Sequence, residues 1–218
     1  MQPGKMKLLK ALFIASIVVF IFLLSFRIAF FDDDYYKEKF RINNAYEKYG
    51  EENVNNANEE LNAYLTGSGE LKTDFFNERE KLHLKDVKDL IWNVFFVFYA
   101  ILFLLVILLC YFIISKKIKI IWESLYTSGL ISFGVVAVFL LVSILNFNWL
   151  FTWFHLLSFN NELWLLPRDS RLVNMFPSGF FSGMFTRILV YSGLTGIGLI
   201  IAGWVIRKFA GKVRMVTK

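Results

Sequence analysis

The sequence predicts an all-α integral membrane protein with four transmembrane helices. Hydrophobic residues make up 56% of the 218 residues and charged residues only 19%, a composition that is not typical of a water-soluble domain. The hydrocarbon core of a bilayer is about 30 Å thick, so a helix needs roughly 20 apolar residues to cross it. The chain contains four such runs, at residues 11–31, 90–114, 125–147 and 180–206.

Basic residues set the expected orientation of these helices, because lysine and arginine collect on the cytoplasmic side of a membrane. Three basic clusters flank the runs: Lys5, Lys7 and Lys10; Lys116, Lys117 and Lys119; and Arg207, Lys208, Lys212, Arg214 and Lys218. We therefore expect residues 1–10, 115–124 and 207–218 to be cytoplasmic. Residues 32–89, with 15 acids and nine bases, and residues 148–179 are then extracytoplasmic. The first run is too long for a cleaved signal peptide and is expected to remain as an anchor.

The first outer segment, residues 32–89, is polar and helix-prone, and a break with two glycines at residues 66–69 divides it into two helical pieces. The second piece is expected to be capped by Thr73 or Asp74 and to run unbroken into the second span. Five of its positions share one face: Phe76, Glu80, His83, Val87 and Leu90. A glutamate and a histidine therefore lie on a face that is otherwise apolar.

The second outer segment, residues 148–179, is too aromatic for a free loop and too often interrupted to cross the bilayer. We expect it to lie in the membrane interface, as short amphipathic helices broken at Pro167 and Pro177. The predicted fold thus has a helical extracytoplasmic segment between the first and second spans. It has an interfacial aromatic loop between the third and fourth.

The chain has two histidines, His83 and His155, one in each outer segment. The predicted topology places both at the same membrane surface. Histidine has an ordinary pKa of ~6.5 and can take up and return a proton at neutral pH. The pair is therefore a candidate for acid–base catalysis, while a purely structural role for each ring remains open.

Other catalytic chemistries find little support. The single cysteine, Cys110, excludes an internal disulfide and a cysteine-based redox pair. Glu80 and His83 have the i, i+3 spacing of carboxylate-bridged metal helices, but a second such motif is missing, so no metal is expected. The chain has no phosphate-binding glycine loop and no Gly-x-Ser-x-Gly elbow, and no cofactor is expected. The net charge of +6 does not indicate nucleic-acid binding, because the bases cluster at the ends of the spans.

Arg27 and Arg187 fall in the outer thirds of the first and fourth spans. An ionisable group is costly at that depth and is a functional candidate by default. The two arginines are therefore candidates for stabilising an oxyanion or holding an anionic head group. The competing explanation is that they extend to the lipid head groups.

Two strings in the outer segments resemble the lipoprotein intramolecular transacylase (Lit) family. The first is Phe76-x-x-x-Glu80-x-x-His83-Leu84-x-Asp86-Val87-Lys88. The second is Phe154-His155-x-x-x-Phe159-x-Asn161-x-x-Trp164-x-x-Pro167-x-Asp169-x-x-Leu172-x-x-x-Phe176-Pro177-x-x-Phe180-Phe181. The strings are specific together and weak apart. One departure is Leu166, where an acid is expected.

The resemblance covers essentially the whole chain and implies an enzyme of the bacterial cytoplasmic membrane. Such enzymes act on lipoproteins whose N-terminal cysteine carries a diacylglyceryl thioether. They move the sn-2 acyl chain to the α-amino nitrogen of the same cysteine, which gives a lyso-form lipoprotein. The paired histidines of the family correspond to His83 and His155, and either one is a candidate for the base.

Further residues are assigned supporting roles on this basis. Glu80 or Asp86 is expected to fix the tautomer of His83, and Asp169 is a candidate for the acid missing at Leu166. Five aromatic residues are lipid-contact candidates: Trp153, Phe154, Trp164, Phe180 and Phe181. The expected partners are diacylglyceryl-modified lipoproteins and membrane lipids, and the chain is expected to be a monomer.

One other class of function stays open at this point, and a further one is disfavoured. A non-enzymatic membrane protein could use the outer segments to dock a partner protein or a lipid, and would tolerate loss of either histidine. A transporter is disfavoured, because the spans carry no paired charges at mid-depth.

Overall fold

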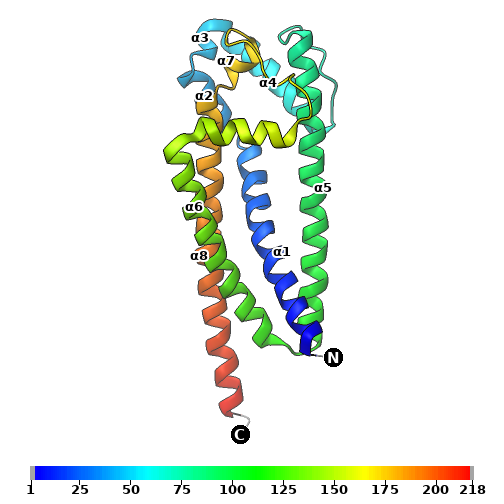
Figure 1. The fold of residues 1–218 in the computed structure, drawn as a ribbon, viewed down its shortest axis with the longest axis vertical. Helices are drawn as coiled ribbons and strands as arrows, with labels where there is room; N and C mark the ends of the chain where they lie inside the picture. Colours follow the sequence, from blue (N-terminus) through cyan, green and yellow to red (C-terminus); the bar gives the residue numbers. More distant parts are fainter. Residues whose placement is uncertain (1–2, 217–218) are drawn as a thin grey trace. The chain divides into compact units, whose positions relative to one another are not determined.

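The structure, a computed structural model, describes residues 3–216, and the side chains of residues 4–209. Four of its helices are long and apolar enough to cross a membrane. They are α1 (Pro3–Phe30), α5 (Glu78–Ile114), α6 (Ile118–Ser158) and α8 (Ser178–Val216) (Figure 1). The described residues contain no β-strand, which confirms the predicted all-α fold of a multi-pass membrane protein. Lys218 and the side chains of Lys212 and Arg214 lie outside the described residues.

Four shorter helices complete the described chain: α2 (Asp33–Ile42), α3 (Ala45–Tyr49), α4 (Glu51–Thr66) and α7 (Arg171–Met175). Their ends follow from local capping. The Asp32 side chain accepts a hydrogen bond from the backbone N–H of Tyr35 at the start of α2. Gly67 ends α4 with a φ of 83°, a left-handed conformation that glycine adopts without a steric penalty.

The start of α5 differs from the prediction that Thr73 or Asp74 caps this helix. Asn77 is the cap, because its Oδ1 accepts a hydrogen bond of 3.0 Å from the backbone N–H of Glu80. Glu80 in turn accepts one of 2.7 Å from the backbone N–H of Asn77. This reciprocal pair is a capping box, which satisfies two backbone donors that the first helical turn otherwise leaves open.

Helix α6 is bent within the segment that the sequence predicts as span and loop. The bend of α6 is visible in Figure 1. Asn146 has φ −162° and ψ 85°, outside the helical range. Its Oδ1 accepts a hydrogen bond from the backbone N–H of Trp149, so the side chain restarts the helix after the break. The aromatic segment after residue 147 is therefore helical as far as Ser158 and irregular from residue 159 to α7.

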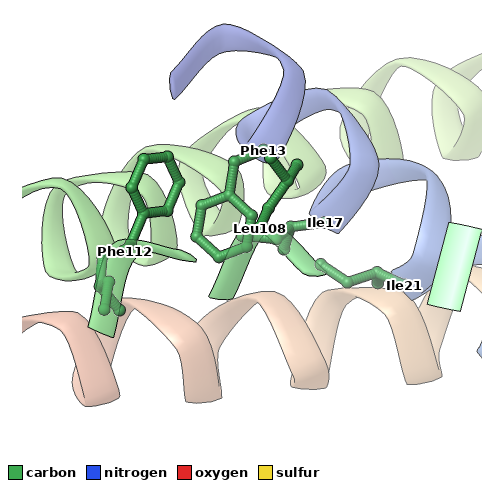
Figure 2. Close-up of a cluster of buried hydrophobic side chains, with 6 residues drawn as sticks. Phe13, Ile17, Ile21, Leu108 and Phe112 are labelled. Atoms are coloured by element: carbon green, nitrogen blue, oxygen red, sulfur yellow. The ribbon is translucent and has the colours of Figure 1, made fainter. Parts of the chain in front are cut away.

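The chain forms two compact units. The bundle unit comprises residues 1–29, 97–141 and 186–218, and the histidine unit comprises residues 30–96 and 142–185. The bundle unit has its own apolar core, part of which is shown in Figure 2, with contributions from Phe13, Ile17, Ile21, Leu108, Phe112 and Ile121. Phe13 and Phe112 pack edge to face with their ring centroids 5.3 Å apart, a favoured geometry for aromatic pairs.

Within the bundle unit, α6 and α8 approach closely at glycines. A Cβ placed on Gly129 would lie 2.5 Å from the carbonyl oxygen of Gly196 and 2.7 Å from Cγ1 of Ile200. Small residues of this kind let membrane helices pack backbone to backbone. A Cβ placed on Gly134, which also lies on α6, would meet no neighbouring atom within 4 Å.

These two glycines provide a matched test of helix packing. We expect Gly129→Ala to destabilise the protein by about 1–3 kcal/mol, because the helix backbones must separate to admit the methyl group. Gly134→Ala should leave stability unchanged or raise it by up to ~1 kcal/mol, because alanine is the better helix former. Thermal unfolding in detergent, followed by tryptophan fluorescence, measures both. Equal effects of the two substitutions would contradict this packing.

Candidate active site

His83 lies on α5, seven residues before the apolar run that begins at Leu90 and therefore outside the spanning segment. Its side chain is buried, with Glu80 and Leu84 buried beside it. Burial lowers the pKa of His83 to about 4, the nearby His155 acts in the same direction, and Asp86 opposes them. The ring is therefore neutral at physiological pH, and its Nδ1 is buried without a hydrogen-bond partner.

His155 lies on the part of α6 that follows the bend at Asn146, beyond the third apolar run. Its Nδ1 is 2.8 Å from the backbone carbonyl oxygen of Phe151, one helical turn earlier. Because a carbonyl only accepts hydrogen bonds, the neutral ring carries its hydrogen on Nδ1 and has its lone pair on Nε2. Burial lowers the pKa of His155, and the Phe151 carbonyl opposes this shift. Nε2 is therefore the basic nitrogen.

The structure brings the two histidines together. Their ring centroids are 6.3 Å apart and the ring planes are tilted by 32°. Phe159 packs against both rings, with its centroid 5.3 Å from that of His83 and 5.7 Å from that of His155. Two neutral imidazoles therefore meet in a largely apolar setting within the histidine unit.

Aromatic side chains enclose His155 more closely than His83. The ring centroid of Phe151 lies 4.3 Å from that of His155, and Trp164 lies 5.0 Å away at a tilt of 33°. Phe154 packs edge-on at 5.3 Å. Trp164 comes from the irregular segment after α6, so this segment covers the ring with an indole face.

The carboxylates expected to orient His83 bond elsewhere. Both oxygens of Glu80 accept backbone hydrogen bonds, Oε2 from Asn77 and Oε1 from Leu172 of α7 at 2.9 Å. Oδ2 of Asp86 accepts a hydrogen bond of 2.9 Å from the side-chain amide of Asn161. The expected tautomer-fixing role is therefore not seen, because Glu80 anchors α7 to the start of α5 and Asp86 anchors the irregular segment.

Asp169 lies at a polar hollow of about 480 Å³ that Asp74, Glu80 and Arg171 also line. Neither histidine lines this hollow. A supporting role for Asp169 in place of an acid at Leu166 stays a prediction. Among the described residues, no group of three or more histidine, cysteine or carboxylate side chains is arranged to hold a metal ion.

The five lipid-contact candidates differ in how exposed their side chains are. Trp153 and Phe154 are 46% and 49% exposed, as lipid-facing side chains should be. Phe180 is 1% exposed and packs among Tyr35, Tyr36 and Phe176, so it belongs to the core of the histidine unit and not to a lipid-facing surface. Phe181 packs against Phe151 at 5.2 Å, and Trp164 packs against His155.

Arg27 and Arg187 belong to the bundle unit. The Arg27 guanidinium donates a hydrogen bond of 3.1 Å to the hydroxyl of Tyr99 and lies over the rings of Phe98 and Tyr99. These contacts satisfy a cation on an apolar helix. A role for either arginine at an oxyanion or a head group stays a prediction.

Comparison with known families decides the class of protein. The sequence model of the family described as "Lipoprotein intramolecular transacylase Lit" matches residues 11–181, well over half of the chain. The chain belongs to the Lit family. The predicted family and enzyme class, lipoprotein intramolecular transacylase, are thereby confirmed. No curated protein sequence matches the chain.

Solved Lit structures share this fold. The membrane integral lipoprotein intramolecular transacylase Lit from Bacillus cereus, solved in meso, has 22% sequence identity and a TM-score of 0.85, over 98% of this chain and 100% of that one. A variant of that protein with one histidine replaced by arginine has 22% identity and a TM-score of 0.78, over 98% and 96% of the two chains. A variant with alanine at the same position has 23% identity and a TM-score of 0.75, over 97% of each chain.

Sequence reasoning missed two contributors to this candidate site. The Phe151 carbonyl, which fixes the tautomer of His155, is a backbone atom and leaves no trace in a residue pattern. Arg79 donates hydrogen bonds from its guanidinium to the carbonyls of Glu162 and Leu165. It is an exposed residue, and no sequence motif marks it as part of a site. The capping box did carry a signal, since Asn77 and Glu80 have the three-residue spacing that such boxes require.

Proposed function

We propose that this Lit-family protein moves the sn-2 acyl chain of a diacylglyceryl-cysteine lipoprotein to the α-amino group of the same cysteine. The observation that carries the proposal is the buried pair of neutral imidazoles, one of which has a defined basic nitrogen. The reaction converts an ester into an amide and is downhill, so it needs no nucleotide and no cofactor. It does need a base, because an α-ammonium group titrates near ~7.7–8.0.

His155 is the base in this mechanism. Its Nε2 takes a proton from the α-ammonium group, and the freed amine attacks the ester carbonyl carbon to give a tetrahedral oxyanion. When the oxyanion collapses, the bond between the carbonyl carbon and the glyceryl oxygen breaks. The protonated His155 then gives a proton to that oxygen, and the second ammonium proton leaves with solvent. No covalent enzyme intermediate forms.

His83 supplies a hydrogen bond to the oxyanion. The ring is neutral, so one of its nitrogens carries a hydrogen, and its buried Nδ1 has no protein partner. We assign this hydrogen to Nδ1, because a donor that lacks a partner in the resting protein is suited to a charge that exists only during the reaction.

The substrate carries both the amine and the ester, so the enzyme mainly supplies orientation, for which effective molarities reach ~10⁵ M or more. Trp153 and Phe154 contact the membrane lipids and the acyl chains next to the site. We place the protein in the bacterial cytoplasmic membrane, with both termini cytoplasmic and the histidines at the outer leaflet. It acts as a monomer and binds no nucleic acid.

The test is to co-express the protein with a reporter lipoprotein in a bacterial host that has no such transacylase. Mass spectrometry of the N-terminal peptide distinguishes the diacylglyceryl form from the lyso form with an N-linked acyl chain. We expect the lyso form only when the wild-type protein is present. A reporter that stays in the diacylglyceryl form would contradict the proposal and favour a docking role for the outer segments.

A further inference from the structure

We propose that Trp164 stabilises the imidazolium that His155 becomes during the reaction, and that Arg79 is a positioning residue that holds Trp164 in place. The inference rests on the proposed function for the identity of the base. It concerns a part of the reaction that the two histidines by themselves do not explain, namely how a positive charge is tolerated in this enclosure.

The need for stabilisation follows from the surroundings of His155. The ring is 8% exposed, and its hydrogen-bond partner is the uncharged carbonyl of Phe151. From α5, the titratable groups that face it are His83, which is neutral, and Asp86 beyond it. Both acids of the irregular segment, Glu162 and Asp169, are exposed. From α8, the apolar Phe181 packs against Phe151, which lies against the ring. Within the described chain, no carboxylate therefore pairs with the imidazolium, in contrast to a catalytic triad.

Trp164 supplies an attraction of another kind. A cation within about 6 Å of an aromatic centroid is attracted by the negative face of the ring, and tryptophan gives the strongest such attraction. The centroids of Trp164 and His155 are 5.0 Å apart and the planes are tilted by 33°, so the indole presents much of its face to the imidazole. The attraction is far weaker for a neutral ring, so it favours the protonated form of His155.

The position of Trp164 depends on contacts from α5 on both sides of it. Nη2 of Arg79 donates hydrogen bonds to the carbonyl oxygens of Glu162 at 2.8 Å and Leu165 at 3.3 Å. Closer to α6, the side-chain amide of Asn161 donates to Asp86 at 2.9 Å. Arg79 therefore ties together the two carbonyls that flank Trp164 in sequence, which restricts the indole to one placement over the base.

Histidine titration by NMR tests the proposal without any substrate. The full-length protein, labelled with ¹³C at histidine Cε1 and held in detergent micelles, gives two signals because the chain has two histidines. His83→Gln assigns them. Trp164→Leu keeps apolar bulk over the ring and removes the aromatic face, so it should lower the titration midpoint of His155 by about half a pH unit or more. Trp164→Phe should give a smaller shift in the same direction.

Matched variants distinguish a specific effect of Trp164 on the pKa of His155 from a general perturbation of the structure. Trp153→Leu removes an indole from the same helix as His155, but that indole is 46% exposed and packs against Trp149, so the midpoint should not move. Arg79→Ala should shift the midpoint downwards, as Trp164→Leu does, and Arg79→Lys should restore it in part. Should Trp164→Leu fail to fold, Trp164→Phe decides the question.

A midpoint of His155 that stays the same or rises in both Trp164 variants would overturn the proposal. A shift as large in Trp153→Leu as in Trp164→Leu would overturn it too. The titration is independent of the reporter assay. Failure of the wild-type protein to produce the lyso form would contradict the proposed function while leaving the effect of Trp164 on His155 measurable.

Discussion

Replacing His155 with alanine should slow acyl transfer by about 10²–10⁴-fold, the range that loss of a general base usually costs. The reason is the defined lone pair on Nε2, which no neighbouring carboxylate can replace, since Glu80 and Asp86 bond elsewhere. The measurement is the initial rate of lyso-form production from a reporter lipoprotein in proteoliposomes, with protein amounts matched.

The second histidine gives a graded comparison. His83→Ala should slow acyl transfer by less than His155→Ala does, by about 10²–10³-fold at most, which is typical of losing one oxyanion donor. Asn160→Ala, an exposed position in the irregular segment, is the control and should retain the wild-type rate. Lyso-form product at the wild-type rate from both histidine variants would remove the catalytic assignment.

Replacing Glu80 with alanine should lower the free energy of unfolding by about 3 kcal/mol or more. The substitution removes two charge-assisted hydrogen bonds, to the backbone N–H groups of Asn77 and Leu172, and it breaks the capping box of α5. The side chain is completely buried, so water does not readily replace these bonds. Thermal unfolding in detergent reports the loss.

Glu78 offers a matched control two residues earlier in the same helical turn. Its side chain is 90% exposed and pairs only with Lys81 at 3.6 Å, so Glu78→Ala should change stability by less than ~0.5 kcal/mol. Glu80→Gln keeps the shape but places an N–H₂ group against a backbone donor, and should fall between the two. Equal melting temperatures for the Glu78 and Glu80 variants would show that the buried carboxylate is not an anchor.

The spans could be predicted from sequence because the hydrocarbon core leaves a chain no choice but long apolar helices. The proximity of His83 and His155 depends on the membrane topology and on the helix face that carries His83. The basic clusters predict the topology, and the residue spacing predicts the helix face. What could not be predicted depends on irregular backbone. Trp164, which packs against His155, lies in a segment without periodicity. That segment follows the part of α6 that begins after the bend at Asn146.

The assignment of carboxylates shows a different limit. Glu80 stands three residues before His83, a spacing that suits a hydrogen bond to the ring and a capping box equally well. Three-dimensional contacts decide between these uses, because Leu172 arrives from a distant part of the chain to occupy the second oxygen. Spacing on one helix cannot reveal such a competitor.

The hydrogen bond between His155 and its own helix has a consequence for how substrate enters. An uncharged amide orients the ring, so the resting pair of imidazoles has no formal charge and no counter-ion. In the proposed mechanism, the two acyl chains of the substrate can therefore approach the histidines without desolvating an ion or breaking a salt bridge. In the proposed mechanism, positive charge enters the site with the α-ammonium group of the substrate and is lost before the product leaves.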